Sequence, residues 1–205
     1  MESSVIVIAT RNPGKVREFA HALAPLNKQV KSLSDYDGLP EIVEDGDTFA
    51  ANARKKAKTT GDALGHPVLA DDSGLCVDKL DGAPGVYSAR YAGEAASDED
   101  NNRKLLAELE QLQLGEDTEQ PLLSTARFVC HLALYDPASG EFVEATGEAE
   151  GRITSDPAGG GGFGYDPLFY LPAYEKTFAE LSLEEKQAVS HRGAALRSLI
   201  DKLTS

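Results

Sequence analysis

Short apolar runs separated by amphipathic stretches divide the chain into expected strands and helices. Val5–Ala9 is apolar throughout, which predicts a short buried strand, and Val30–Leu33 predicts a second. Pro13 suits the first position of a helix whose apolar residues fall on one face. Thr48 can cap another helix, which we expect to run to about Thr60. The N-terminal part is therefore predicted to consist of βα units.

A second group of strands is expected in the middle of the chain. Pro67–Ala70 and Leu75–Val77 are predicted as two short strands. Arg127–Tyr135 alternates between apolar and polar residues, and Phe142–Ala149 follows after the turn at 136–140. These last two segments predict a long antiparallel hairpin.

Two capping boxes mark helix starts in the rest of the chain, at Ser97–Asp100 and at Ser182–Glu185, and a last helix is expected from Ser190. The mixture of βα units with a long hairpin predicts an α/β protein. We expect a mixed β-sheet flanked by helices, in a single domain over 1–205 whose two lobes have a substrate cleft between them.

Composition excludes some classes of partner. The net charge of −14 argues against a protein that wraps a nucleic-acid backbone. Residues 94–119 hold nine acids and two bases and predict a solvated helix and its loop. No signal peptide or membrane span is recognisable, so the expected location is the cytoplasm, without a membrane partner. Cys76 and Cys130 lie in apolar strand patterns and are expected to be core thiols.

The first candidate for chemistry is the pair Asp71 and Asp72, followed by Ser73 and a glycine. Adjacent carboxylates at a strand end are costly unless a cation or solvent meets them. A divalent metal is the simplest partner, since Mg²⁺ prefers hard oxygen ligands. The alternative is a strand followed by an Asx turn.

A second candidate is Thr10-Arg-Asn-Pro-Gly-Lys15, which follows a strand and opens a helix. Backbone N–H groups at a helix N-terminus favour an anion, and Lys15 adds positive charge. The pattern is not a Walker motif, because the second glycine and the Lys-Ser/Thr pair are missing. An ordinary turn with a solvated lysine remains the alternative.

Three further clusters carry polar or aromatic groups. Glu44 precedes a helix on which Asn52 and Lys56 share a face, although a solvated face would look the same. Residues 159–164 hold five glycines around an aromatic, which permits close approach to a base, or marks a flexible linker. Ser190-His-Arg-Gly193 offers donors at a helix start, or a simple cap.

Together these segments closely resemble the inosine/xanthosine triphosphate pyrophosphatases, which remove deaminated purine triphosphates from the nucleotide pool. The resemblance covers nearly the whole chain in order and has no counterpart for the loop at 115–121. The matching segments are Thr10–Lys15, Thr48–Ala57, Ala70–Leu75, Gly82–Tyr91, Gly162–Pro167 and Ser190–Gly193.

The resemblance implies an elongated mixed-sheet fold, a homodimer, and Mg²⁺-dependent hydrolysis of ITP, dITP or XTP to monophosphate and pyrophosphate. It implies Asp72 as general base and metal ligand, with Glu44 as the second metal carboxylate and Lys56 orienting the water. The implied substrate contacts are Thr10, Arg11, Asn12, Pro13, Gly14 and Lys15 for the triphosphate, Ser73, and Phe163, Gly164, Tyr165, Asp166, Lys186, His191 and Arg192 around the base.

The donors and acceptors of this last group suit a 6-oxopurine. Hypoxanthine and xanthine present an O6 acceptor and an N1–H donor, and adenine presents the reverse. His191 and Arg192 as donors, with a carboxylate as acceptor, therefore favour 6-oxopurines. Two alternatives remain open: a pyrophosphatase of the same fold for other modified nucleotides, and a nucleotide-sensing module without catalysis.

Overall fold

The computed structural model describes residues 4–113 and 122–204. Seven strands form one sheet in the order β2-β1-β3-β4-β5-β6-β7. β1 is parallel to β2 and β3, whereas β6 is antiparallel to β5 and β7, so the predicted mixed sheet of an α/β protein is confirmed. The strands are β1 (Val5–Ile8), β2 (Gln29–Ser32), β3 (Val68–Val77), β4 (Leu122–Asp136), β5 (Glu141–Thr154), β6 (Phe169–Leu171) and β7 (Lys176–Thr177). The α-helices are α1 (Pro13–Leu23), α2 (Phe49–Leu64), α3 (Asp98–Gln113), α4 (Leu183–Val189) and α5 (His191–Thr204).

The chain divides into two compact units. The first is built from the described parts of Met1–Asp72, Cys130–Gly147 and His191–Ser205. The second is built from those of Ser73–Val129 and Glu148–Ser190. The long strands β3, β4 and β5 contribute residues to both units.

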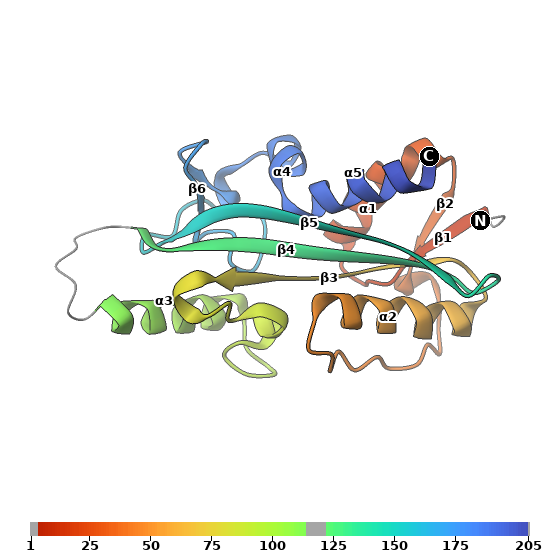
Figure 1. Ribbon diagram of the computed structural model, residues 1–205, viewed down its shortest axis with the longest axis horizontal. Coiled ribbons are helices and arrows are strands. Elements are labelled where there is room, and N and C mark those ends of the chain that lie inside the picture. The colour runs from red at the N-terminus through yellow and green to blue at the C-terminus, as the bar shows by residue number, and fades with distance from the viewer. Residues whose placement is uncertain (1–3, 114–121, 205) are drawn as a thin grey trace. The chain divides into compact units, whose positions relative to one another are not determined.

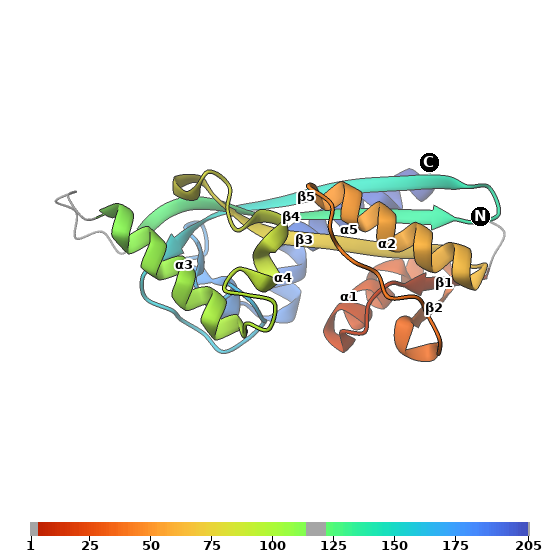
Figure 2. The same ribbon diagram turned by 90° about the horizontal axis from the view of Figure 1, so that it is seen from below.

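The first unit has three layers, because alternate residues of each strand face opposite sides of the sheet. Ile6, Ile8 and Leu69 pack with residues of α1 and α5 on one face. Val7 and Ala70 pack against α2 on the other face. Figure 1 shows α1 and α5 together on one side of the strands, and Figure 2 shows α2 running along β3.

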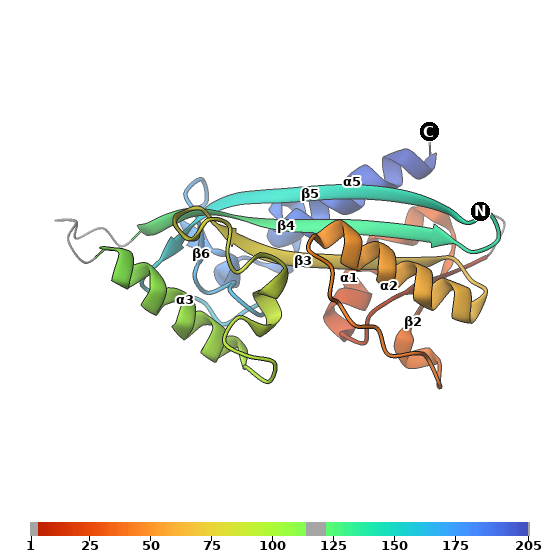
Figure 3. The same ribbon diagram turned by 60° about the horizontal axis from the view of Figure 1, so that its bottom comes forward.

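The second unit has its own hydrophobic core. Leu105 and Leu109 of α3 are fully buried in one cluster with Leu75 and Val77 of β3. Figure 3 shows α3 beside the end of β3. Three aromatic rings complete this core, with centroids 4.6 to 5.6 Å apart: Phe128, Phe169 and Phe178. Each unit thus has a separate apolar core.

The helix starts agree with the sequence predictions. The Asn12 side chain caps α1 and the Thr48 side chain caps α2. Ser97 and Asp100 bond each other's backbone N–H groups at the start of α3, and Ser182 and Glu185 do the same at α4. The predicted capping boxes are therefore confirmed.

One sequence prediction about the strands is wrong. Pro67–Ala70 and Leu75–Val77 were expected to be separate strands with a turn between them, but Val68–Val77 is a single ten-residue strand. Asp71 and Asp72 therefore lie in the middle of β3, where they are 2% and 9% exposed. The strand continues through them because each carboxylate has a partner inside the protein: Lys15 pairs with Asp71, and Asn52 donates a hydrogen bond to Asp72.

Candidate active site

The two adjacent aspartates of β3 face opposite sides of the sheet. Neighbouring residues of a strand point to opposite faces, so Asp71 shares the face of Leu69, covered by α1 and α5. Asp72 shares the face of Ala70, covered by α2. The two carboxylates therefore have different hydrogen-bond partners, Lys15 for Asp71 and Asn52 for Asp72, although the charge of Lys56 acts on both.

Asp71 is surrounded by cations. Its Oδ2 lies 2.7 Å from Lys15 Nζ and 3.8 Å from Arg192 Nε. Burial by itself would raise the pKa of Asp71, but Lys15, Arg192 and Lys56 outweigh burial and hold it well below its usual value. The lowered pKa favours an ionised Asp71, which pairs with Lys15 and lies beside Arg192.

Asp72 has a different environment. Its Oδ2 accepts a hydrogen bond of 3.0 Å from Asn52 Nδ2, and Asn52 Oδ1 accepts one of 2.7 Å from the Gly46 backbone N–H. Burial raises the pKa of the Asp72 carboxyl to about 6. The Asn52 hydrogen bond and the charge of Lys56 act in the opposite direction without cancelling this effect. A carboxylate that titrates near neutral pH is suited to accept a proton during a reaction.

Lys56 pairs with Glu44, and its charge also acts on Asp72. Lys56 Nζ lies 2.8 Å from Glu44 Oε1, and its side chain is 12% exposed. Burial would lower the pKa of Lys56, but the charges of Asp71, Glu44 and Asp72 together raise it. Asn52, one helical turn before Lys56, is 1% exposed. The alternative of a solvated helix face is therefore wrong for these two residues.

Glu44 and Asp72 could hold a metal ion. No cluster of three or more metal-ligating side chains of the His, Cys, Asp or Glu type exists among residues 4–113 and 122–204. Mg²⁺ does not need one, because it binds through one or two carboxylates and completes its shell with water and substrate phosphates. Both carboxylates act on the same Lys56 ammonium, so the donor chemistry fits a magnesium–nucleotide complex.

The segment before α1 is organised by Asn12. Asn12 Oδ1 accepts hydrogen bonds from the backbone N–H groups of Gly14, at 2.8 Å, and Lys15, at 3.2 Å. The Asn12 N–H is 3.2 Å from Thr10 Oγ1. Pro13 occupies the first helical turn, and Arg11 is exposed. The Gly14 amide, which was predicted to hold phosphate, is therefore bonded to Asn12, and an arriving anion would have to exchange with that side chain.

The second unit holds the glycine-rich segment, which is an ordered loop and not the linker considered as an alternative. The Phe163 ring is 45% exposed. The Phe163 N–H donates to Asp166 Oδ2 at 2.9 Å, and the same oxygen forms an ion pair with Lys186. Lys186 Nζ also lies 5.4 Å from the centre of the Phe163 ring. Tyr165 is buried, and its hydroxyl donates to the Ser88 carbonyl at 2.8 Å.

Gly162 is needed for this loop. It has a φ of +74°, in the left-handed region, and a Cβ there would lie 2.0 Å from Asp166 Oδ2. A side chain at this position would therefore displace the Asp166 carboxylate from Phe163 and Lys186.

Three other predicted residues are Ser73, which lies on β3, and His191 and Arg192, which lie at the start of α5. Ser73 follows Asp72 on β3 and is half-buried. His191 and Arg192 begin α5 in the first unit, 6% and 4% exposed. Arg192 Nη1 donates to Glu18 Oε2 at 2.8 Å. The structure thus places Arg192 with Asp71 and Glu18, and its predicted contact with a base edge stays a prediction.

Comparison with known proteins assigns the family. Residues 6–202 match the sequence profile of the Ham1 family. The chain belongs to the Ham1 family. It is 53% identical over 198 residues to the dITP/XTP pyrophosphatase of Geobacter sulfurreducens, covering 97% of this chain and 96% of that protein. It is 54% identical over 194 residues to the dITP/XTP pyrophosphatase of an Exiguobacterium species, covering 95% and 94%.

Solved structures of related proteins have the same fold over nearly the whole chain. A HAM1 protein from Coxiella burnetii superposes with a TM-score of 0.87 at 40% identity, covering 98% of both chains. A nucleoside-triphosphatase / dITP/XTP pyrophosphatase from Mycobacterium abscessus superposes with a TM-score of 0.75 at 41% identity, covering 96% of this chain and 98% of that one. No helix among the described residues of this Ham1 protein is long and apolar enough to cross a membrane.

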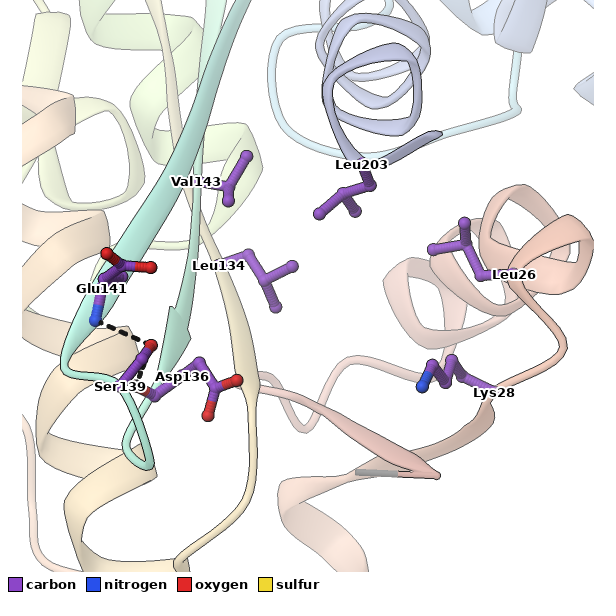
Figure 4. Close-up of a pocket in the computed structure, with 8 residues that line it drawn as sticks. All are labelled: Leu26, Lys28, Leu134, Asp136, Ser139, Glu141, Val143 and Leu203. Carbon is purple, nitrogen blue, oxygen red and sulfur yellow. Dashed lines mark hydrogen bonds between the residues drawn. The ribbon is translucent and has the colours of Figure 1, made fainter. Parts of the chain in front are cut away.

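A separate pocket of the first unit contains none of the predicted site residues. It has a volume of about 440 Å³. Figure 4 shows the side chains of Leu26, Leu134, Val143 and Leu203 around it, with Ser139 and Glu141 joined by a hydrogen bond of 3.3 Å. The remaining residues that line it are Lys28 and Asp136.

Sequence reasoning missed two residues that organise the Ham1 site. In the sequence, Asp71 stood out only as the neighbour of Asp72. Because β3 is one continuous strand, the two side chains face opposite sides of the sheet and have different roles. Glu18 lies one helical turn after Lys15, and only the tertiary structure shows that it pairs with Arg192.

Proposed function

We propose that this chain hydrolyses deaminated purine nucleoside triphosphates, dITP, ITP and XTP, to the monophosphate and pyrophosphate. The observation that carries the proposal is Asp72, a buried carboxylate whose pKa is raised to about 6 beside Lys56 and Glu44. Membership of the Ham1 family, with relatives named dITP/XTP pyrophosphatases, supports this choice of substrates.

Hydrolysis of a phosphoanhydride needs an oriented water and compensation of charge more than a covalent nucleophile. Asp72 would accept a proton from the water that attacks the α-phosphorus, and the α–β anhydride bond would break with pyrophosphate as the leaving group. Lys56 would hold that water and balance the negative charge of Asp72 and Glu44. The ion pair between Lys56 and Glu44 supports this arrangement.

We propose Mg²⁺ as the cofactor, one ion per subunit or more, with Glu44 and Asp72 as its protein ligands. When bound, the ion would neutralise charge on the phosphates. Lys15 would bind the phosphate chain with the backbone from Thr10 to Gly14, together with Arg11 and Ser73. The position of Lys15 at the start of α1, held by Asp71, supports this role.

For the base, we propose that the Phe163 ring stacks on the purine, because it is the exposed aromatic of an otherwise fixed loop. Asp166 and Lys186 would bind or support the base edge, with Gly164 and Tyr165 contributing backbone. His191 and Arg192 would donate to O6. A homodimer and a cytoplasmic location also belong to this proposal, and both rest on the sequence alone.

Pyrophosphate release from ITP, XTP, GTP and ATP, with Mg²⁺ and with EDTA, tests the proposal. We expect metal-dependent release from ITP and XTP, with GTP and ATP slow. Release mainly from a methylated or otherwise modified nucleotide would favour the alternative of a related pyrophosphatase. Binding of ITP without release from any substrate would favour the sensing module.

A further inference from the structure

The first turns of α3 hold the backbone of Gly164 from both sides. The Gly164 N–H donates to Asp98 Oδ2 at 2.7 Å, and the Gly164 carbonyl accepts from Asn102 Nδ2 at 3.0 Å. Asp98 and Asn102 are four residues apart and therefore lie on one face of the helix. All three residues belong to the second unit.

This end of α3 is itself fixed. Ser97 and Asp100 form the capping box at its start. Asn101 is 2% exposed and bonds the backbone on both sides, accepting from the Ala92 N–H at 2.8 Å and donating to the Ala89 carbonyl at 3.2 Å. Asp98 and Asn102 therefore lie on a helix start that these hydrogen bonds hold in place.

The Asn102 side chain has an unusual feature. Its Oδ1 atom is buried and has no hydrogen-bond partner within the part of the chain that the structure describes. A buried acceptor without a partner is unfavourable, so the hydrogen bond made by Nδ2 of the same side chain has to offset that cost. The bond from Nδ2 to Gly164 is the contact that Asn102 makes toward the loop.

Gly164 directly follows Phe163, the exposed ring. Gly164 has a φ of +62°, so the loop changes direction at this residue. Asp166 and Lys186 fix the other side of Phe163, through its N–H and across its ring. The two bonds from α3 therefore hold the backbone directly after Phe163, between that ring and the buried Tyr165.

We propose that Asp98 and Asn102 are positioning residues, which hold Gly164 and through it set the orientation in which the Phe163 ring receives the purine. The inference rests on the proposed function, since it requires Phe163 to stack on a base. It gives the acidic helix a role in substrate binding that acts through Gly164.

The test measures IMP binding by calorimetry and steady-state ITP hydrolysis for Asp98→Ala and Asn102→Ala. IMP carries the base and cannot lose pyrophosphate, so its dissociation constant is independent of turnover. We expect this constant and the KM for ITP to rise about fivefold to tenfold in each variant, with kcat within about twofold of wild type. Asp98→Asn keeps an acceptor and should restore binding.

Glu99→Ala is the matched control, because Glu99 lies on the same turn and pairs with Arg103 at 3.0 Å, away from the loop. The decisive step repeats both alanine variants in a Phe163→Ala background. If α3 acts through the ring, they should cause no further loss there. Equal losses in both backgrounds, or unchanged IMP binding in the single variants, would overturn the inference.

Failure of the proposed function would look different. A wild-type protein that binds IMP but releases no pyrophosphate from ITP would contradict the proposed function, and the binding cycle would still decide the role of α3. A wild-type protein that binds neither nucleotide would overturn both.

Discussion

At the scale of single residues, two adjacent aspartates have opposite properties because of where a strand points them. Lys15 and Arg192 keep Asp71 ionised, whereas burial keeps the pKa of Asp72 near 6. The first residue organises cations and the second is suited to accept a proton. Environment, and not residue type, separates the two roles.

The pH dependence of hydrolysis follows from Asp72. Because its carboxylate is needed as a base and is protonated below its pKa, kcat/KM at low Mg²⁺ should fall as the pH decreases through about 6. Raising Mg²⁺ should move this acidic limb to lower pH, since a cation favours the ionised carboxylate. Initial rates between pH 4.5 and about 8 measure the limb.

Lys56→Met provides the companion test. Lys56 lowers the pKa of Asp72, so removing its charge should move the acidic limb to higher pH and reduce kcat. A limb that stays in place in this variant, and at every Mg²⁺ concentration, would show that another group titrates.

Phe163→Ala tests the exposed ring. Stacking of a base on an aromatic side chain is worth about 1–3 kcal/mol, so the dissociation constant for IMP should rise about fivefold to 150-fold, with a similar rise in KM for ITP. Phe163→Tyr keeps a ring and should bind nearly as wild type. Unchanged KM and binding in the alanine variant would mean that Phe163 has a packing role only.

At the scale of elements, the sequence predicted those parts whose signals are local. Pro13 and the caps at Thr48 and Ser97 place three helix starts correctly, because these signals depend on residues within one turn. The break in β3 was wrong, because Asp71 and Asp72 look like turn residues unless their distant partners Lys15 and Asn52 are known. Tertiary contacts overrode local preference there.

The close packing of β5 against α5 leads to a prediction about stability. A Cβ on Gly147 would lie 2.2 Å from the His191 carbonyl oxygen and 2.3 Å from the Ala195 nitrogen, both backbone atoms of α5. Gly147→Ala should therefore lower the free energy of unfolding by about 1–3 kcal/mol. It should also reduce activity, because it displaces the helix start that carries His191 and Arg192.

Urea unfolding followed by circular dichroism measures this loss. Gly160→Ala is the control, since a Cβ there meets nothing within 4 Å. Equal stability of the two variants would contradict the packing of β5 on α5.

At the scale of the whole molecule, each unit carries its own group of the predicted site residues. The first holds Glu44, Lys56 and Asp72, and the second holds the Phe163 loop. The sequence led to both groups through the resemblance of its separate motifs to the pyrophosphatase family, and their roles stay predictions. It could not predict that Asp98 and Asn102 bond Gly164, because more than sixty residues separate those partners along the chain.

The oligomeric state is a prediction at this scale. If the resemblance to dimeric pyrophosphatases extends to assembly, sedimentation equilibrium at micromolar concentration should give the mass of two chains. A mass of one chain of 21.8 kDa across the same range would contradict the proposed homodimer.

The central claim is that Asp72 activates water for cleavage of the α–β anhydride. The most direct test measures the products of dITP hydrolysis by the wild type and by Asp72→Asn, with dITP binding measured alongside. The wild type should form pyrophosphate and dIMP in equal amounts, and Asp72→Asn should bind dITP with little turnover. Near-normal kcat in Asp72→Asn, or orthophosphate as the first product, would contradict the account.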